Sequence, residues 1–250
     1  FSMEIIKNIR NSQRLAKWEI RPIDVVLFIC LALTFAYGLT GLLAQAHVYL
    51  SGEELATDSL SFLIVSGFGL QLGCVAALGG IHIISPTENS NKPESFWQAV
   101  KIGLIGFIAA YLLIIPTMMI WKIVLEALNF EYKVQLPVQL VQNGGTNIEM
   151  ALMALLVVVA APVVEELVYR GFLFRYLNNR VPPGSAIAIT AILFAAIHQN
   201  LYSFVPLTIL GAALCIVYRL SGNIVSSITM HACFNLLNLI LMVYFSPLDV

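Results

Sequence analysis

Two adjacent carboxylates, Glu165 and Glu166, end a long apolar run in the second half of the chain. A charged group at the edge of such a run is costly to place in a membrane, by about 2.5–3.5 kcal/mol on insertion scales, so it needs a partner or a function. On a helix, Glu166 and Arg170 are four residues apart and can form an ion pair. Glu165 is rotated from Glu166 by about 100° and must find another partner. The candidates are His198 and His231, each within its own apolar run.

Two further pairs of residues repeat the spacing of one helical turn. Phe194 precedes His198 by four residues, and His231 precedes Asn235 by four, so each pair projects from one face of a helix. A carboxylate hydrogen-bonded to a neutral imidazole can take a proton from water, which can then attack a peptide carbonyl. His231 and Asn235 could donate to the resulting oxyanion, an effect of roughly 2.7–4 kcal/mol per donor. We therefore predict a hydrolytic site, with Glu166 and Arg170 as a structural clamp.

Two alternatives use the same residues. Polar side chains inside membrane spans commonly join helices, and His198, His231 or Asn235, taken singly, fits that role as well. Glu165, His198 and His231 could also form an open zinc site with three protein ligands. The sequence has no HExxH pattern, and Asn235, one turn from His231, suits an oxyanion clamp better than a second ligand. We therefore expect a metal-free site without a cofactor, with zinc as the alternative.

Composition places these residues in a membrane protein. Of the 250 residues, 59% are hydrophobic and only 11% are charged, and the mean hydropathy is +0.87. A soluble domain would carry about 25% charged residues. The net charge of −1 gives no reason to expect a nucleic-acid partner. The four cysteines stand singly in apolar runs, without metal-ligand spacing, and are read as small core residues.

Apolar runs of about 20 residues, the length that crosses a hydrocarbon core, predict an all-α polytopic bundle of about seven spans. The predicted spans are 25–46, 60–84, 102–121, 147 to about 178, two helices within 181–218, and 224–245. Gln199, Asn200 and Pro206 are expected to break the run 181–218 into its two helices. The expected organisation is a basic amphipathic segment 1–22 lying on the membrane surface, three N-terminal membrane helices within 23–146, and a catalytic core 147–250.

Basic residues set the predicted orientation. With the N-terminus in the cytoplasm, every Lys and Arg except Lys122 and Lys133 falls in a cytoplasmic segment. Seven spans then place the C-terminus outside and Glu165 near the cytoplasmic end of its helix. The absence of long loops and appended domains favours a prokaryotic plasma membrane. The sequence leaves the oligomeric state open.

The three patterns occur in order as EExxxR (165–170), FxxxH (194–198) and HxxxN (231–235). Together they resemble the CAAX-protease and bacteriocin-processing (CPBP) family of intramembrane endopeptidases, the type II CAAX prenyl protease-like enzymes, over about 147–238. The resemblance implies that Glu165 and His198 activate water and that His231 and Asn235 line the oxyanion hole. It also implies that Glu166 and Arg170 support the site. The expected partners are the lipid bilayer and a peptide or lipidated protein substrate, including a prenylated CAAX-type peptide.

Two non-enzymatic functions remain as rivals. A scaffold or immunity protein could sequester a peptide with the same fold, and a proton-coupled transporter could use Glu165 as its proton carrier. A transporter would more typically show paired half-repeats, which the sequence lacks. A buried aspartate pair and a Ser-His-Asp triad are disfavoured because the aspartates, Asp24, Asp58 and Asp249, all lie at the ends of apolar runs. Counting alone does not exclude a Ser-His dyad, but no serine lies in a recognisable nucleophile turn.

Overall fold

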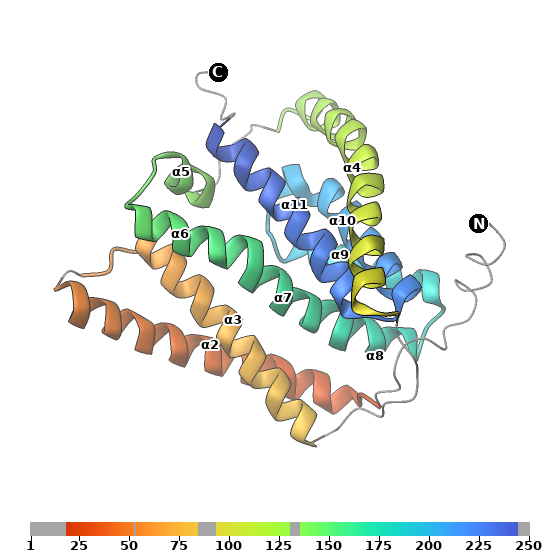
Figure 1. Ribbon diagram of the computed structural model, residues 1–250, viewed down its shortest axis with the longest axis horizontal. Helices are drawn as coiled ribbons and strands as arrows, with labels where there is room; N and C mark the ends of the chain where they lie inside the picture. The colour runs from red at the N-terminus through yellow and green to blue at the C-terminus, as the bar shows by residue number, and fades with distance from the viewer. Residues whose placement is uncertain (1–18, 53, 85–93, 131–135, 245–250) are drawn as a thin grey trace. The chain divides into compact units, whose positions relative to one another are not determined.

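The computed structural model describes residues 19–52, 54–84, 94–130 and 136–244, and every regular element in these ranges is a helix (Figure 1). The helices are α2 (Pro22–Ser51), α3 (Leu60–Ile84), α4 (Phe96–Ala127), α5 (Leu136–Gln142), α6 (Asn147–Leu155), η2 (Leu156–Ala160), α7 (Ala161–Glu166), η3 (Leu167–Phe174), α8 (Arg175–Asn178), α9 (Pro183–Ala196), α10 (Leu201–Ser221) and α11 (Ile224–Tyr244). The segments from α6 to α8 form one continuous helix, in which η2 and η3 are π-helical. The predicted all-α architecture is confirmed.

Six helices in the described ranges are long and apolar enough to cross a membrane: α2, α3, α4, the continuous helix Asn147–Asn178, α10 and α11. The apolar helix α9 has 14 residues and so reaches about 21 Å, short of a hydrocarbon core of about 30 Å. With α9, the described helices agree with the prediction of about seven spans in a multi-pass membrane protein. The predicted surface helix in 1–22 falls largely outside the described residues. The cytoplasmic orientation and the three-segment organisation stay predictions.

The break between α9 and α10 differs in one respect from the prediction. Gln199 has a positive φ of 49°, and Asn200 caps α10 by accepting from the backbone N–H groups of Tyr202 and Ser203. Pro206, expected to contribute to the break, instead lies inside α10. A proline has no N–H to bond the carbonyl four residues before it, here Tyr202 near the start of α10, and the helix continues without this bond.

The chain divides into two compact units, which are described separately. The first unit contains α4, the end of the continuous helix from Glu166 onward, α9, α10 and the first half of α11. Part of its core consists of Phe174, Ala186, Cys215 and Tyr218. A Cβ atom on Gly103 of α4 would clash with the backbone oxygen of Ser226 on α11, so glycine is required for this close packing.

The second unit contains α2, α3, α5, residues 147–165 and the second half of α11. Helices α2 and α3 pack against each other so closely that a Cβ atom on Gly73 would clash with the backbone of Ala36. The apolar core of this unit includes Leu60, Ile64, Val141, Met153 and Leu156. The elements of this unit pack around the first part of the continuous helix, residues 147–165, and Glu165 is the last residue of that part.

Candidate active site

In the first unit, a buried carboxylate joins two of the predicted motifs. Oε1 of Glu166 accepts a hydrogen bond from Nη1 of Arg170 at 2.7 Å and another from Nδ1 of His231 at 2.9 Å. The side chains of Glu166 and Arg170 are fully buried, and that of His231 is 3% exposed. The predicted pair of Glu166 and Arg170 is therefore present, and His231 is a second partner that the sequence did not indicate.

Arg170 is held from two further sides. Its Nη2 donates to the backbone oxygen of Gly211 on α10 at 3.0 Å, and its guanidinium carbon lies 4.8 Å from the ring centre of Phe194. Gly211 also allows α10 to approach α9, because a Cβ atom there would lie only 2.9 Å from the Cα atom of Ala191. A buried ion pair is stable only if further hydrogen bonds compensate for its desolvation, and the Gly211 carbonyl supplies one of them.

Phe194 is the central ring of this cluster. It is fully buried, and its ring makes edge-to-face contacts with His198 at 5.1 Å, with His231 at 5.6 Å and with Tyr169 at 5.2 Å between ring centres. Such contacts add roughly 0.5–1.5 kcal/mol each for aromatic pairs and favour fixed ring orientations. Phe194 therefore contacts both imidazoles and is their common neighbour.

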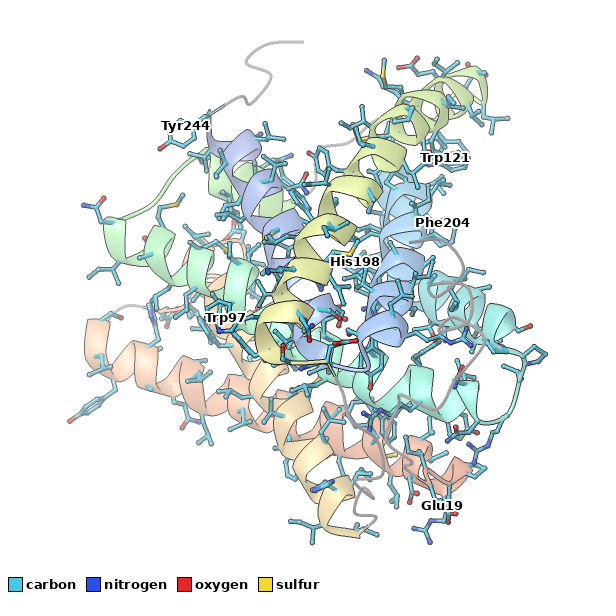
Figure 2. All side chains as sticks on the ribbon, turned by 45° about the vertical axis from the view of Figure 1, so that its right-hand side comes forward. Glu19, Trp97, Trp121, His198, Phe204 and Tyr244 are labelled. Carbon is cyan, nitrogen blue, oxygen red and sulfur yellow. The ribbon has the colours of Figure 1, made fainter. Side chains whose placement is uncertain are left out.

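His198 lies just beyond the end of α9, at the surface of the chain (labelled in Figure 2). The sequence alone placed it within an apolar run, but its ring is exposed because α9 ends at Ala196. Its Nδ1 lies 2.7 Å from the backbone oxygen of Phe194. A carbonyl oxygen only accepts, so Nδ1 carries the proton, and Nε2 is the basic nitrogen of the neutral ring.

The same argument fixes the tautomer of His231. The ionised carboxylate of Glu166 only accepts, so Nδ1 of His231 donates to it. Nε2 then carries a lone pair in the neutral imidazole and a proton in the imidazolium. His231 can therefore donate from Nε2 to an oxyanion only as the imidazolium.

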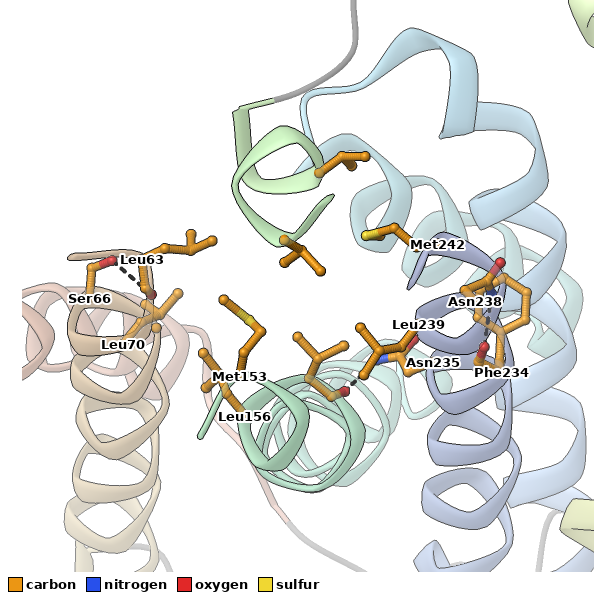
Figure 3. Close-up of a pocket in the computed structure, with 14 residues that line it drawn as sticks. Leu63, Ser66, Leu70, Met153, Leu156, Phe234, Asn235, Asn238, Leu239 and Met242 are labelled. Atoms are coloured by element: carbon orange, nitrogen blue, oxygen red, sulfur yellow. Dashed lines mark hydrogen bonds between the residues drawn. The ribbon is translucent and has the colours of Figure 1, made fainter. Parts of the chain in front are cut away.

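The second unit holds the other two predicted site residues. Glu165 is partly buried in α7. Asn235 is also partly buried, and its Nδ2 donates to the backbone oxygen of Val157 in η2 at 2.8 Å (dashed in Figure 3). Asn235 lines a cavity of about 500 Å³ whose walls are mostly apolar. The cavity lies between α3, α5, the α6–η2 part of the continuous helix and α11 (Figure 3).

The first unit thus brings together five of the predicted site residues, namely Glu166, Arg170, Phe194, His198 and His231. Glu165 and Asn235 belong to the second unit, so the predicted pairing of Glu165 with His198 stays a prediction. Sequence reasoning missed Gly211 and Val157, because both act through backbone oxygens. A glycine inside an apolar run is a signal of close helix contact, whereas nothing in the sequence marks Val157.

No group of three His, Cys, Asp or Glu side chains that could hold a metal ion occurs within the described residues of either unit. The predicted zinc alternative needs Glu165 from one unit and His198 and His231 from the other. Both the metal-free site and its zinc alternative therefore stay predictions.

Comparison with known proteins identifies the region that carries the motifs. Residues 147–237 match the family described as type II CAAX prenyl endopeptidase Rce1-like. No curated protein and no solved structure matches the chain. The matched region contains the EExxxR, FxxxH and HxxxN patterns in full. Residues 147–237 of this multi-pass membrane protein are thus similar to the Rce1-like family of type II CAAX prenyl endopeptidases, in agreement with the resemblance of its three motifs.

Proposed function

We propose that the protein is an intramembrane endopeptidase that hydrolyses a peptide bond in a prenylated CAAX-type peptide or another membrane-associated peptide. The family match supports a peptidase of this general class. The observation that carries the proposal is the cluster in the first unit, in which Phe194 contacts both imidazoles and Glu166 holds His231. This cluster places two imidazoles, each with Nδ1 engaged in a hydrogen bond, against one buried aromatic ring.

In the proposed reaction, Glu165 removes a proton from a water molecule that His198 holds by a hydrogen bond, and the water oxygen attacks the carbonyl carbon of the scissile bond. Nε2 of His198 suits this role because Nδ1 is engaged with the Phe194 carbonyl. The carbonyl becomes a tetrahedral oxyanion. The proton taken from water then passes to the leaving nitrogen as the C–N bond breaks, which yields a carboxylic acid and an amine.

The oxyanion receives hydrogen bonds from His231 and Asn235 in this proposal. In this scheme His231 donates from Nε2 as an imidazolium whose Nδ1–H is held by Glu166, and Asn235 donates one N–H of its amide. Each such donor is worth roughly 2.7–4 kcal/mol of transition-state stabilisation. Glu166, Arg170 and Phe194 do not contact the substrate in this scheme. They hold the His231 ring and its charge in place.

The cavity of the second unit supports a substrate with a large apolar part. Its lining includes Leu70, Leu156 and Leu239, and Asn235 is among its few polar side chains. An apolar group held there would bring the adjoining peptide close to Asn235, and removal of the group from contact with water would contribute about 25 cal/mol per Å² of buried surface.

The test is the cleavage of a farnesylated CAAX peptide by purified protein in detergent, run in water enriched in ¹⁸O, with and without a metal chelator. The proposal predicts one ¹⁸O atom in the new carboxylate, faster cleavage of the farnesylated peptide than of the same peptide without the lipid, and no effect of the chelator. Absence of cleavage of every peptide would support the scaffold or transporter reading. Loss of cleavage with the chelator and its recovery with zinc would establish the metal-dependent alternative.

A further inference from the structure

The continuous helix 147–178 contains a defect next to Asn235. In the π-helical segment η2, the N–H of Ala161 bonds the oxygen of Leu156, five residues earlier, instead of the usual four. Pro162 follows immediately and has no N–H to donate. The hydrogen-bond ladder of the helix is therefore interrupted at one place, three to four residues before the carboxylate pair.

The interruption leaves one backbone oxygen without a helical donor. The oxygen of Val157 could accept from residue 161 in α-type pairing or from residue 162 in π-type pairing. Ala161 already donates to Leu156, and residue 162 is proline. The amide of Asn235 fills this position at 2.8 Å, from α11 of the same unit. A buried carbonyl group that lacks a partner in its own helix is commonly satisfied by a side chain in this way.

This bond fixes the orientation of the Asn235 amide. Because a backbone carbonyl only accepts, the atom facing Val157 must be Nδ2, and Oδ1 points away. An NH₂ group has two hydrogens, so one N–H anchors the side chain and the other remains for a second acceptor. Asn235 also lines the cavity. The amide that carries the second N–H therefore borders the space proposed for the substrate.

We propose that Pro162 is a positioning residue for Asn235: by lacking an N–H it keeps the Val157 oxygen open, and this oxygen anchors the amide that binds the substrate oxyanion. The inference rests on the proposed function for its catalytic part, since the oxyanion exists only if the chain hydrolyses peptides. The anchoring itself is independent of activity, and it can be measured without a substrate.

The kinetic test compares Pro162→Ala with wild type in the full-length protein. The substitution restores an N–H at position 162 that competes with Asn235 for the Val157 oxygen. We expect kcat to fall about tenfold, less than the 100–1000-fold loss typical of deleting an oxyanion donor, with KM within about twofold. Asn235→Ala should give the full loss, and Pro162→Ala should cause no further loss in that background. An equal fall in both backgrounds, or a change in melting temperature without any change in kcat, would overturn the inference.

Pro206→Ala is the matched control, because Pro206 also lies inside a helix but belongs to the other unit. It should leave kcat unchanged. The substrate-free measurement is the NMR spectrum of protein labelled with ¹⁵N-asparagine, in which the Asn235 side-chain signal is assigned by its loss in Asn235→Ala. Pro162→Ala should shift that signal, and Pro206→Ala should not. If wild type cleaves no peptide, the proposed function fails, while an unshifted signal in Pro162→Ala overturns the anchoring separately.

Discussion

Glu166 has two roles that substitutions can separate. It balances the charge of the buried Arg170, and it accepts the hydrogen bond that holds His231. Glu166→Gln leaves the Arg170 guanidinium fully buried without a negative partner. Removing one partner of a buried ion pair costs about 3–5 kcal/mol. For a chain of this size, each kcal/mol lowers the melting temperature by about 2–4 °C, so we expect a fall of roughly 6–20 °C. Arg170→Met should cost a similar amount.

Replacing both partners should reverse the loss of stability but not the loss of activity. The double variant Glu166→Leu with Arg170→Met removes both charges, and apolar replacement of a buried pair is often neutral or stabilising by about 1–4 kcal/mol. Its melting temperature should therefore lie well above that of either single variant. His231 still lacks the acceptor for its Nδ1–H, so cleavage of the farnesylated peptide should remain reduced by about 100-fold.

The matched control is a pair with the same spacing at the surface of the chain. Lys122 and Glu126 are also four residues apart, at 3.7 Å, but their side chains are 66% and 55% exposed. Exposed pairs contribute a median of about 0–1 kcal/mol, so Glu126→Gln should change the melting temperature by only a few degrees at most. A double variant at positions 166 and 170 that is less stable than either single one, or that cleaves at the wild-type rate, would refute the reasoning.

Three further outcomes are expected. Phe194→Leu should lower the melting temperature by a few degrees and reduce cleavage by more than the loss of folded protein explains, because both site imidazoles and Arg170 lose the ring they contact. A loss of activity that only matches the loss of folded protein would contradict this. Gly211→Ala should destabilise the first unit, since the added Cβ atom would meet the Ala191 backbone. Gly184→Ala in α9 is the control: its added Cβ atom would enter open space, so thermal unfolding should show a neutral effect or a stabilisation of up to about 1 kcal/mol. Elemental analysis of purified active protein should find no stoichiometric zinc, and a full equivalent would contradict the metal-free site.

The sequence predicted the long helices well because their limits follow from local signals. Leu60–Ile84 begins and ends where polar residues interrupt its apolar run, and Asn147–Asn178 continues through its charged residues and ends shortly before Pro182. Pro206 shows where local signals fail, because a proline breaks a helix only if the lost hydrogen bond and the ring clash are not absorbed nearby. The π-helical segments were not predicted either, since they depend on how the helix packs and no residue type specifies them.

The site was predictable to the extent that it rests on helical spacing. The ion pair of Glu166 and Arg170 follows from a separation of four residues. The bond between Glu166 and His231 does not, because it joins residues 65 positions apart through tertiary packing. Of the two adjacent carboxylates, the sequence singled out Glu165 as the partner of the imidazoles, whereas the structure gives Glu166 the hydrogen bond to His231. Both assignments hold together if Glu165 acts on water and Glu166 acts on the imidazole.

The rate of cleavage of the farnesylated CAAX peptide by Glu165→Gln tests the central claim most directly. The substitution keeps the shape of the side chain and removes its ability to accept a proton from water. We expect cleavage to fall at least about 100-fold, the lower range for loss of a general base, in protein that melts within a few degrees of wild type. Cleavage at the wild-type rate by folded Glu165→Gln would contradict the account, because Glu165 would then not be the base that activates water.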